Sequence, residues 1–93
     1  MVTINFESIE VFVDIEKKKK VVANERKGFA DTMYRNGQGL PFHALALKIY
    51  NSHGDTEYSD EEYELIVKVA EACYAPCFID AIRSYKKADT GGL

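Results

Sequence analysis

Apolar and polar residues alternate with a period of two along residues 9–16. The apolar side of the alternation consists of Ile9, Val11, Val13 and Ile15. The stretch is rich in β-branched residues, and this pattern is typical of a half-buried β-strand. Residues 16–20, which include four consecutive lysines, would form a polar turn, and residues 21–23 a short return strand. The pattern therefore predicts an N-terminal β-hairpin.

One long helix is the alternative for the same stretch, and it would make the chain all-α. The apolar stripe of that helix would contain Phe6, Ile9 and Val13. The next positions on that face are Glu16 or Lys17, so the stripe ends too early for a buried helix. The hairpin is the better prediction for residues 8–23.

A first helix is predicted over residues 25–36. Asn24 precedes it and has a side chain suited to N-capping. Phe29 and Met33 lie on its apolar face. Gly37 follows, and glycine suits the left-handed conformation that commonly ends a helix.

Residues 40–50 contain few polar side chains. Pro41 suits the first turn of a helix there, and Gly54 marks its latest end. A helix that is apolar nearly all round is a buried one. We therefore expect this second helix to lie at the centre of the domain.

The most specific local signal is the pair Ser59 and Glu62, three positions apart. This spacing permits reciprocal capping of a helix N-terminus, and predicts a third helix over residues 59–74. Pro76 cannot continue that helix, but it suits the first turn of another one. A fourth helix is predicted over residues 75–87.

These elements predict an α+β fold that is predominantly helical. A short N-terminal β-hairpin would be followed by about four helices packed as a small antiparallel bundle. The chain has 93 residues, of which 46% are hydrophobic and 29% charged, as in an ordinary soluble globular domain. We expect a single domain over residues 1–88 and a flexible C-terminal tail over residues 89–93.

The net charge and the absence of targeting signals narrow the possible cellular locations and partners. The formal net charge is −3, unlike the basic balance of most nucleic-acid binders. No apolar run reaches the ~20 residues that span a bilayer, and the N-terminus lacks the pattern of a signal peptide. The chain contains two cysteines without disulfide-rich spacing. We expect a cytoplasmic protein with no membrane contact.

Cys73 and Cys77 are the first candidates for chemistry. A zinc site would need two further ligands, and His43 and His53 are ten positions apart. Pro76 lies between the cysteines, and apolar neighbours indicate burial, which makes a thiol inert. We expect two packing cysteines, with no metal site, no cofactor and no catalytic residue.

The leading hypothesis is a non-catalytic protein–protein interaction module, not an enzyme. It would be a small cytosolic adaptor, assembly factor or inhibitor, of a kind frequent among bacterial and phage accessory proteins. Its binding surface would be an acidic helical face, because acids are dense between positions 55 and 64. The partner-binding candidates are Asp55, Glu57, Asp60, Glu61 and Glu64.

Two alternative functions and a possible homodimer also remain as hypotheses. A nucleic-acid-associated regulator would use a basic cluster made of Lys17, Lys18, Lys19, Lys20 and Arg26; nucleic acid is the less favoured partner. A small-molecule binder would need a pocket near His43 with Cys73 and Cys77. The apolar residues 40–50 exceed what a small core buries, which favours a homodimer.

Overall fold

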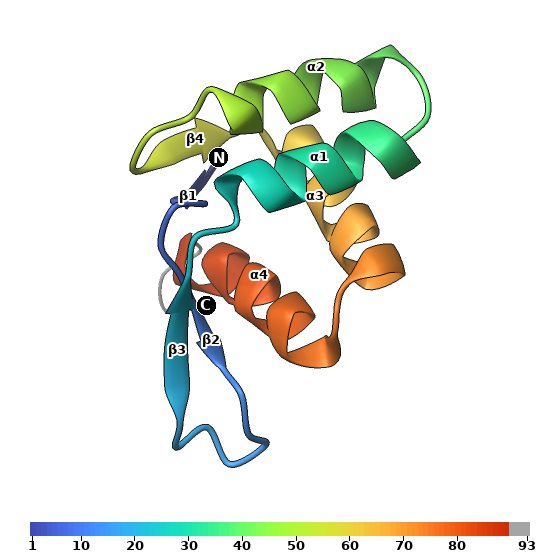
Figure 1. The fold of residues 1–93 in the computed structure, drawn as a ribbon. Coiled ribbons are helices and arrows are strands. Elements are labelled where there is room, and N and C mark those ends of the chain that lie inside the picture. Colours follow the sequence, from blue (N-terminus) through green and yellow to red (C-terminus); the bar gives the residue numbers. More distant parts are fainter. Residues whose placement is uncertain (90–93) are drawn as a thin grey trace.

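The structure is a computed structural model, and it describes residues 1–89. Its elements are β1 (Val2–Ile4), β2 (Ile9–Phe12), β3 (Lys20–Ala23), α1 (Arg26–Asn36), α2 (Leu40–Tyr50), β4 (Thr56–Tyr58), α3 (Asp60–Cys73) and α4 (Pro76–Asp89). Within these residues, four helices and two antiparallel strand pairs (Figure 1) confirm the predicted α+β, mainly helical class. Of the predicted tail, Asp89 belongs to α4, and residues 90–93 lie outside the described residues.

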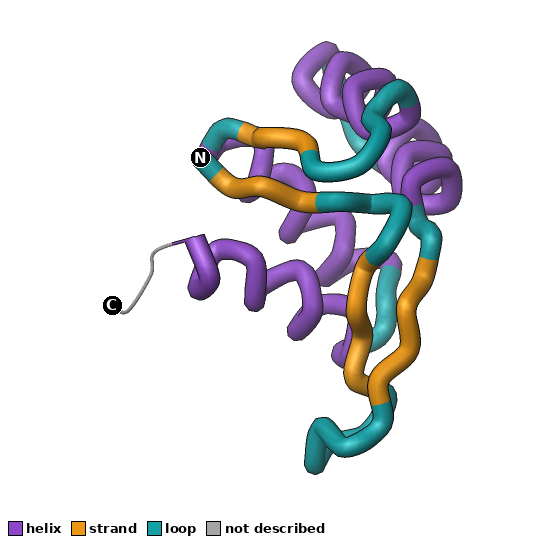
Figure 2. The backbone as a smooth tube through the Cα atoms, turned by 90° about the vertical axis from the view of Figure 1, so that its left-hand side faces the viewer, coloured by secondary structure: helices purple, strands orange, loops and turns teal. Residues whose placement is uncertain are grey.

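The predicted hairpin is present and excludes the helical alternative. β2 and β3 pair antiparallel, with Ile9 opposite Ala23 and Val11 opposite Val21. The hairpin extends from the body of the molecule as an arm (Figures 1 and 2). Ile9 and Val11 are buried as expected, because this face of β2 packs on the core.

The predicted strand is too long at its C-terminal end. Val13 and Ile15 were expected on the buried face, but Val13 is 48% exposed and Ile15 is 99% exposed. The Asp14 carboxylate accepts the backbone N–H groups of Lys18 and Lys19, at 3.0 Å each. These bonds fold the chain into a turn directly after β2, and Lys17 adopts a positive φ of 58° there.

A second strand pair joins the N-terminus to the middle of the chain, and the sequence patterns did not predict it. β1 pairs antiparallel with β4, with Val2 opposite Tyr58 and Ile4 opposite Thr56. Val2, Ile4 and Tyr58 are fully or almost fully buried. The pair places β1 beside the entrance to α3 (Figure 2).

Aromatic rings fill the centre of the core. Phe6 lies 5.1 Å from Phe29 and 5.8 Å from Tyr58, measured between ring centroids. Phe29 continues the stack toward Tyr74 and Phe78, at 5.3 and 5.9 Å. Offset and edge-on ring pairs of this kind add to the stabilisation from burial. The turn after β1, helix α1 and the α3–α4 joint therefore share one core.

The connection between α1 and α2 corrects the prediction for Gly37. Gly37 has φ −76° and ψ 156°, which is extended and not left-handed. A Cβ atom at this position would lie 2.5 Å from the Cβ of Phe42, so glycine permits the close approach of α2. The positive φ belongs to Gly39 instead, at 91°. At the start of α1, the N-cap residue is Glu25 and not Asn24, and the Glu25 side chain makes no capping hydrogen bond. The Asn24 Oδ1 atom instead accepts the Arg26 N–H at 3.3 Å.

The expectation of a central, buried α2 is wrong. Leu45, Ala46 and Ile49 face the core, but Leu40 is 82% exposed and Leu47 is 46% exposed. α2 lies alongside α1 at the periphery, and no described element covers its outer face (Figure 1). The apolar composition of α2 could not predict this exposure, because the burial of a helix face depends on which other elements pack against it.

The capping signal of α3 is confirmed. The Ser59 hydroxyl accepts the Glu62 N–H at 3.1 Å, and the Glu62 carboxylate accepts the Ser59 N–H at 2.8 Å. Lys48 of α2 donates to the same carboxylate at 2.9 Å. Burial alone would raise the pKa of the Glu62 carboxyl, but the bonds from Ser59 and Lys48 outweigh it and lower that pKa.

Candidate functional site

The predicted acidic residues occupy the segment from the loop before β4 into α3. Four are exposed on β4 or the first turns of α3, namely Glu57, Asp60, Glu61 and Glu64. Asp60 lies 3.6 Å from the N-terminal ammonium of Met1. Asp55 precedes β4 and lines a groove described below. The predicted set therefore divides between the α3 entrance and this groove.

The predicted basic cluster does not form one surface. Lys18 lies 3.1 Å from Glu16, and Lys20 lies 3.3 Å from Glu10. Lysines 17–19 occupy the tip of the arm, whereas Arg26 lies beyond the other end of β3. Acids therefore stand among these lysines and are not turned away from them, so the arrangement gives no support to the nucleic-acid alternative.

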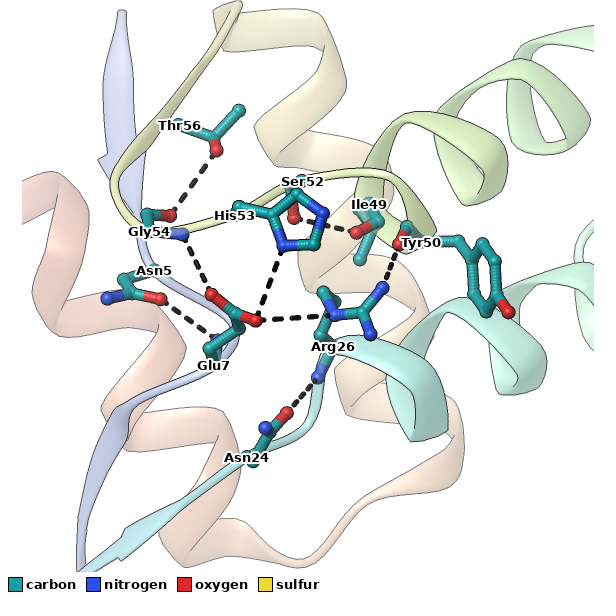
Figure 3. A network of polar contacts seen from close by, with 10 residues as sticks. All are labelled: Asn5, Glu7, Asn24, Arg26, Ile49, Tyr50, Ser52, His53, Gly54 and Thr56. Atoms are coloured by element: carbon teal, nitrogen blue, oxygen red, sulfur yellow. Dashed lines mark hydrogen bonds and ion pairs between the residues drawn. The ribbon is translucent and has the colours of Figure 1, made fainter.

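Arg26 belongs to a network of polar contacts centred on Glu7 (Figure 3). Its Nε atom lies 3.6 Å from the Glu7 carboxylate. Its guanidinium also donates to the Tyr50 carbonyl oxygen and lies 5.3 Å from the centroid of the Tyr50 ring. The charge of Arg26 is therefore used inside the fold, between α1 and α2.

Glu7 joins three segments of the chain from the turn between β1 and β2. Its carboxylate accepts the Gly54 N–H at 2.9 Å, and lies 3.5 Å from the Nδ1 atom of His53. The bond from Gly54, with His53 and Arg26 nearby, holds the pKa of the Glu7 carboxyl below its ordinary value, although partial burial acts in the opposite direction. The Glu7 network is a clamp that fastens the turn to α1 and the α2–β4 loop.

The residues of the predicted small-molecule pocket lie on different elements. His43 is exposed on α2, with its ring 5.6 Å from that of Tyr34. Cys73 ends α3, and Cys77 is in the first turn of α4. Cys77 lines the groove described below, whereas His43 and Cys73 do not.

The prediction that both cysteines are buried is wrong for Cys73, which is exposed, while Cys77 is half-buried. The α3–α4 joint lies at the edge of the molecule (Figure 1). Tyr74, between the two helices, turns inward and stacks on Phe78 at 4.4 Å. Both cysteines are free.

A groove of about 840 Å³ lies between the arm and α4. One wall is formed by β1, the following turn, β2 and the arm tip, through Thr3, Asn5, Ser8, Glu10, Phe12, Val13, Asp14, Ile15 and Lys17. The other wall consists of Ala75 and one face of α4, formed by Pro76, Cys77, Asp80, Ala81, Ser84 and Tyr85. Asp55 completes the lining. In Figures 1 and 2, β2 lies between β3 and α4, so the groove follows the side of β2 that β3 leaves open.

The lining of the groove combines apolar surface with negative charge. Its charged members are four carboxylates and one ammonium group, those of Glu10, Asp14, Asp55, Asp80 and Lys17. Burial raises the pKa of the Tyr85 hydroxyl, and the nearby charges of Glu10 and Asp55 act in the same direction.

Exposed apolar side chains gather on the arm. Phe12, Val13 and Ile15 line the groove, and Val21 and Val22 are exposed on β3. Contiguous exposed apolar surface on a soluble protein commonly marks a binding site. The alternation at residues 9–16 carried this signal, but it predicted burial for Val13 and Ile15 instead. The contribution of α4 had no local signal, because the arm and α4 are almost sixty positions apart in the sequence (75 − 17 = 58).

Metal-ligand clusters and membrane-spanning helices are both absent from the described part of the chain. No group of three or more His, Cys, Asp or Glu side chains in this part of the chain has an arrangement that could hold a metal ion. None of the described helices has the length and apolar character needed to cross a membrane. No protein-family model, curated protein or solved structure matches the chain.

Proposed function

We propose that this chain is a non-catalytic protein–protein interaction module that binds a basic segment of a partner protein in the groove between β2 and α4. The observation that carries the proposal is the combination in one groove of exposed apolar side chains and four carboxylates, of which, within residues 1–89, only that of Glu10 lies near a lysine ammonium group, that of Lys20. Apolar burial supplies affinity, and charge complementarity supplies selectivity for a basic segment. The adaptor, assembly-factor and inhibitor roles all require such a surface.

The shape of the groove supports a segment of chain as its ligand. The wall that contains α4 runs from Ala75 to Tyr85. Ten residue steps along an α-helix span about 15 Å. An extended segment of about five residues has that length. The opposite wall continues from β1 to the tip of the arm.

The groove uses only part of the acidic face predicted from the sequence. Asp55 lines it, whereas the other four candidates lie on β4 and α3. The proposal therefore assigns direct contacts to Asp55 and to three acids outside the predicted set, namely Glu10, Asp14 and Asp80. The remaining predicted acids contribute at longer range, which salt screens.

The test compares two variants with the same change in net charge. The probe is a synthetic peptide of alternating Lys and Val, labelled for fluorescence anisotropy. Reversal of Asp55 and Asp80 to Lys inside the groove is expected to weaken binding about tenfold, since each reversal replaces attraction by repulsion. Reversal of Glu57 and Glu61 to Lys is the matched control outside the groove, and is expected to change binding less than about threefold.

Two results would refute the proposed groove. If both double variants lose the same amount of peptide affinity, the binding surface is the wider acidic face and not the groove. Equal binding of an alternating Glu and Val peptide would remove the role of charge. Circular dichroism of each variant checks that the fold is retained.

A homodimer is a second proposal, supported by the outer face of α2. This face carries Leu40, Leu47 and Tyr50, with Tyr34 of α1 also exposed. Burial of such a patch between two copies would remove it from water. Sedimentation at several concentrations tests this directly: Leu40→Gln with Leu47→Gln should shift a dimer to monomer, and a wild-type monomer at all concentrations contradicts it.

A further inference from the structure

The unpaired edge of β2 can be located from the hydrogen bonds of the hairpin. The Val13 N–H donates to the Lys19 carbonyl oxygen at 2.9 Å, directly after the paired strands. In an antiparallel pair, residues that bond across the ladder alternate with residues whose N–H and C=O groups point away from it. Val11 and Ile9 therefore bond to β3, whereas the backbone groups of Glu10 and Phe12 point to the other side.

That other side is the groove. Glu10 and Phe12 line it, and no residue of β3 does. Both views of the backbone place β2 between β3 and α4 (Figures 1 and 2). Within residues 1–89, no hydrogen bond from another element reaches the N–H groups of Glu10 or Phe12. The groove therefore presents a strand edge with free donors and acceptors beside an apolar helix face.

We propose that the partner segment binds in an extended conformation, as a third strand added to β2, with α4 as the second wall. This inference rests on the proposed function and specifies how the same groove binds its ligand. An added strand would satisfy the backbone groups of Glu10 and Phe12, as in other peptide-binding domains that use a sheet edge.

The occupant that fits is a segment alternating basic and apolar residues. Successive side chains of a strand point to opposite faces. One set would face α4 and meet lining such as Ala81 and Tyr85, and the other would lie on the face of β2 that carries the Glu10 carboxylate. A single extended conformation of the ligand then contacts both the apolar surface and the carboxylates of the groove.

A second copy of this chain is a poor occupant of the same edge. Pairing of β2 with its own copy would bring Glu10 and Asp14 of one molecule close to the same carboxylates of the other. Like charges opposite one another destabilise a strand pair. Charges on exposed edges are a common protection against self-pairing. The acids of the arm therefore disfavour self-addition and favour a basic partner.

The experiment uses N-methylation to remove the backbone N–H donors from one edge of the peptide strand or from the other. Two versions of the alternating Lys and Val peptide carry N-methyl groups, one on every Lys and the other on every Val. Only one of these sets can face β2 in an added strand. One version should therefore bind at least about tenfold more weakly than the other, because it loses two or three hydrogen bonds.

Hydrogen exchange on the intact chain supplies a second measurement with internal controls. The amides of Glu10 and Phe12 should gain at least about tenfold protection when the unmodified peptide is bound. The amides of Val11 and Val13 already bond to β3, so their exchange should change much less. Equal affinities of the two methylated peptides, or unchanged exchange at Glu10 and Phe12, would overturn strand addition while leaving the groove as binding site. Failure of the unmodified peptide to bind would instead refute the proposed function.

Discussion

The carboxylate of Glu7 differs in its surroundings from two carboxylates of the groove, those of Asp55 and Asp80. Glu7 accepts the Gly54 N–H and lies near both His53 and Arg26. Asp55 and Asp80 form no ion pair with any side chain that the structure describes. A carboxylate with internal donors stabilises the fold, whereas an exposed one without them costs the fold little and stays available to a partner.

The same contrast separates two phenylalanines on either side of the turn. Phe6 is fully buried between Phe29 and Tyr58, next to the Glu7 clamp. Phe12 is 40% exposed and lines the groove. Substitutions in the clamp region should change the free energy of unfolding and leave binding in place. Substitutions in the groove should do the reverse.

The largest effect is expected for Phe6→Ala. Loss of a buried phenylalanine ring leaves a cavity in the core and costs about 3–5 kcal/mol of unfolding free energy. Urea denaturation followed by circular dichroism measures this loss. A change below about 1 kcal/mol would mean that the aromatic core does not have the packing described here.

Phe12→Ala is the matched substitution in the groove. Its expected loss of unfolding free energy is below about 1 kcal/mol, because the side chain is partly exposed. Binding of the alternating Lys and Val peptide should fall about five- to tenfold, since an aromatic contact is removed. Anisotropy and urea denaturation on the same sample separate the two effects. Unchanged binding with a large loss of stability would reverse the roles assigned to these regions.

Glu7→Gln tests the clamp through pH. The pKa of Glu7 is lower in the folded chain than its ordinary value of 4.5, so the ionised carboxylate favours folding. This contribution is fully present above the pKa of the unfolded chain, and is lost as the pH falls through the lower folded pKa. The Tm of the variant should therefore be below that of the wild type near pH 7, and the two values should converge as the solution is acidified. A Tm difference that stays constant down to strong acid would contradict the role of this charge.

The smallest effect is expected for thiol reactivity. Cys73 is exposed and Cys77 is half-buried beside the groove. A small thiol reagent should label Cys73 about as fast as a free thiol, and Cys77 several-fold more slowly. Bound peptide should slow the labelling of Cys77 further and leave Cys73 unchanged. Protection of Cys73 alone would place the ligand elsewhere.

Local signals in the sequence predicted local structure well. The Ser59 and Glu62 pair forms the expected capping box, and Pro76 begins α4 as expected. The hairpin was predicted from its alternation, but not its length, because the bonds of Asp14 to later backbone groups end β2 early. Such side-chain bonds depend on the turn that they help to form, so the alternation alone does not reveal them.

Features that depend on distant segments were missed. The β1–β4 pair consists of two three-residue strands, too short for a periodic pattern. The position of α2 was wrong, because apolar composition does not say which neighbours will cover a helix. For the groove, only three lining residues were among the predicted site residues, namely Asp55, Cys77 of the small-molecule alternative and Lys17 of the nucleic-acid alternative. Its free edge follows from the register of β2 and β3, which the sequence patterns left unspecified.

The pairing of Val2 with Tyr58 has a consequence for how the chain is made. The first strand cannot find its partner until 56 further residues (58 − 2) have been synthesised. At about 5–20 residues per second this takes roughly 3–11 s. Helices α1 and α2 lie inside that interval and need only local contacts, so they can form first. β1 can thus be fixed only after α1 and α2 have been synthesised, although it precedes both in the chain, and the aromatic core around Phe6 is not complete before Tyr58 is present.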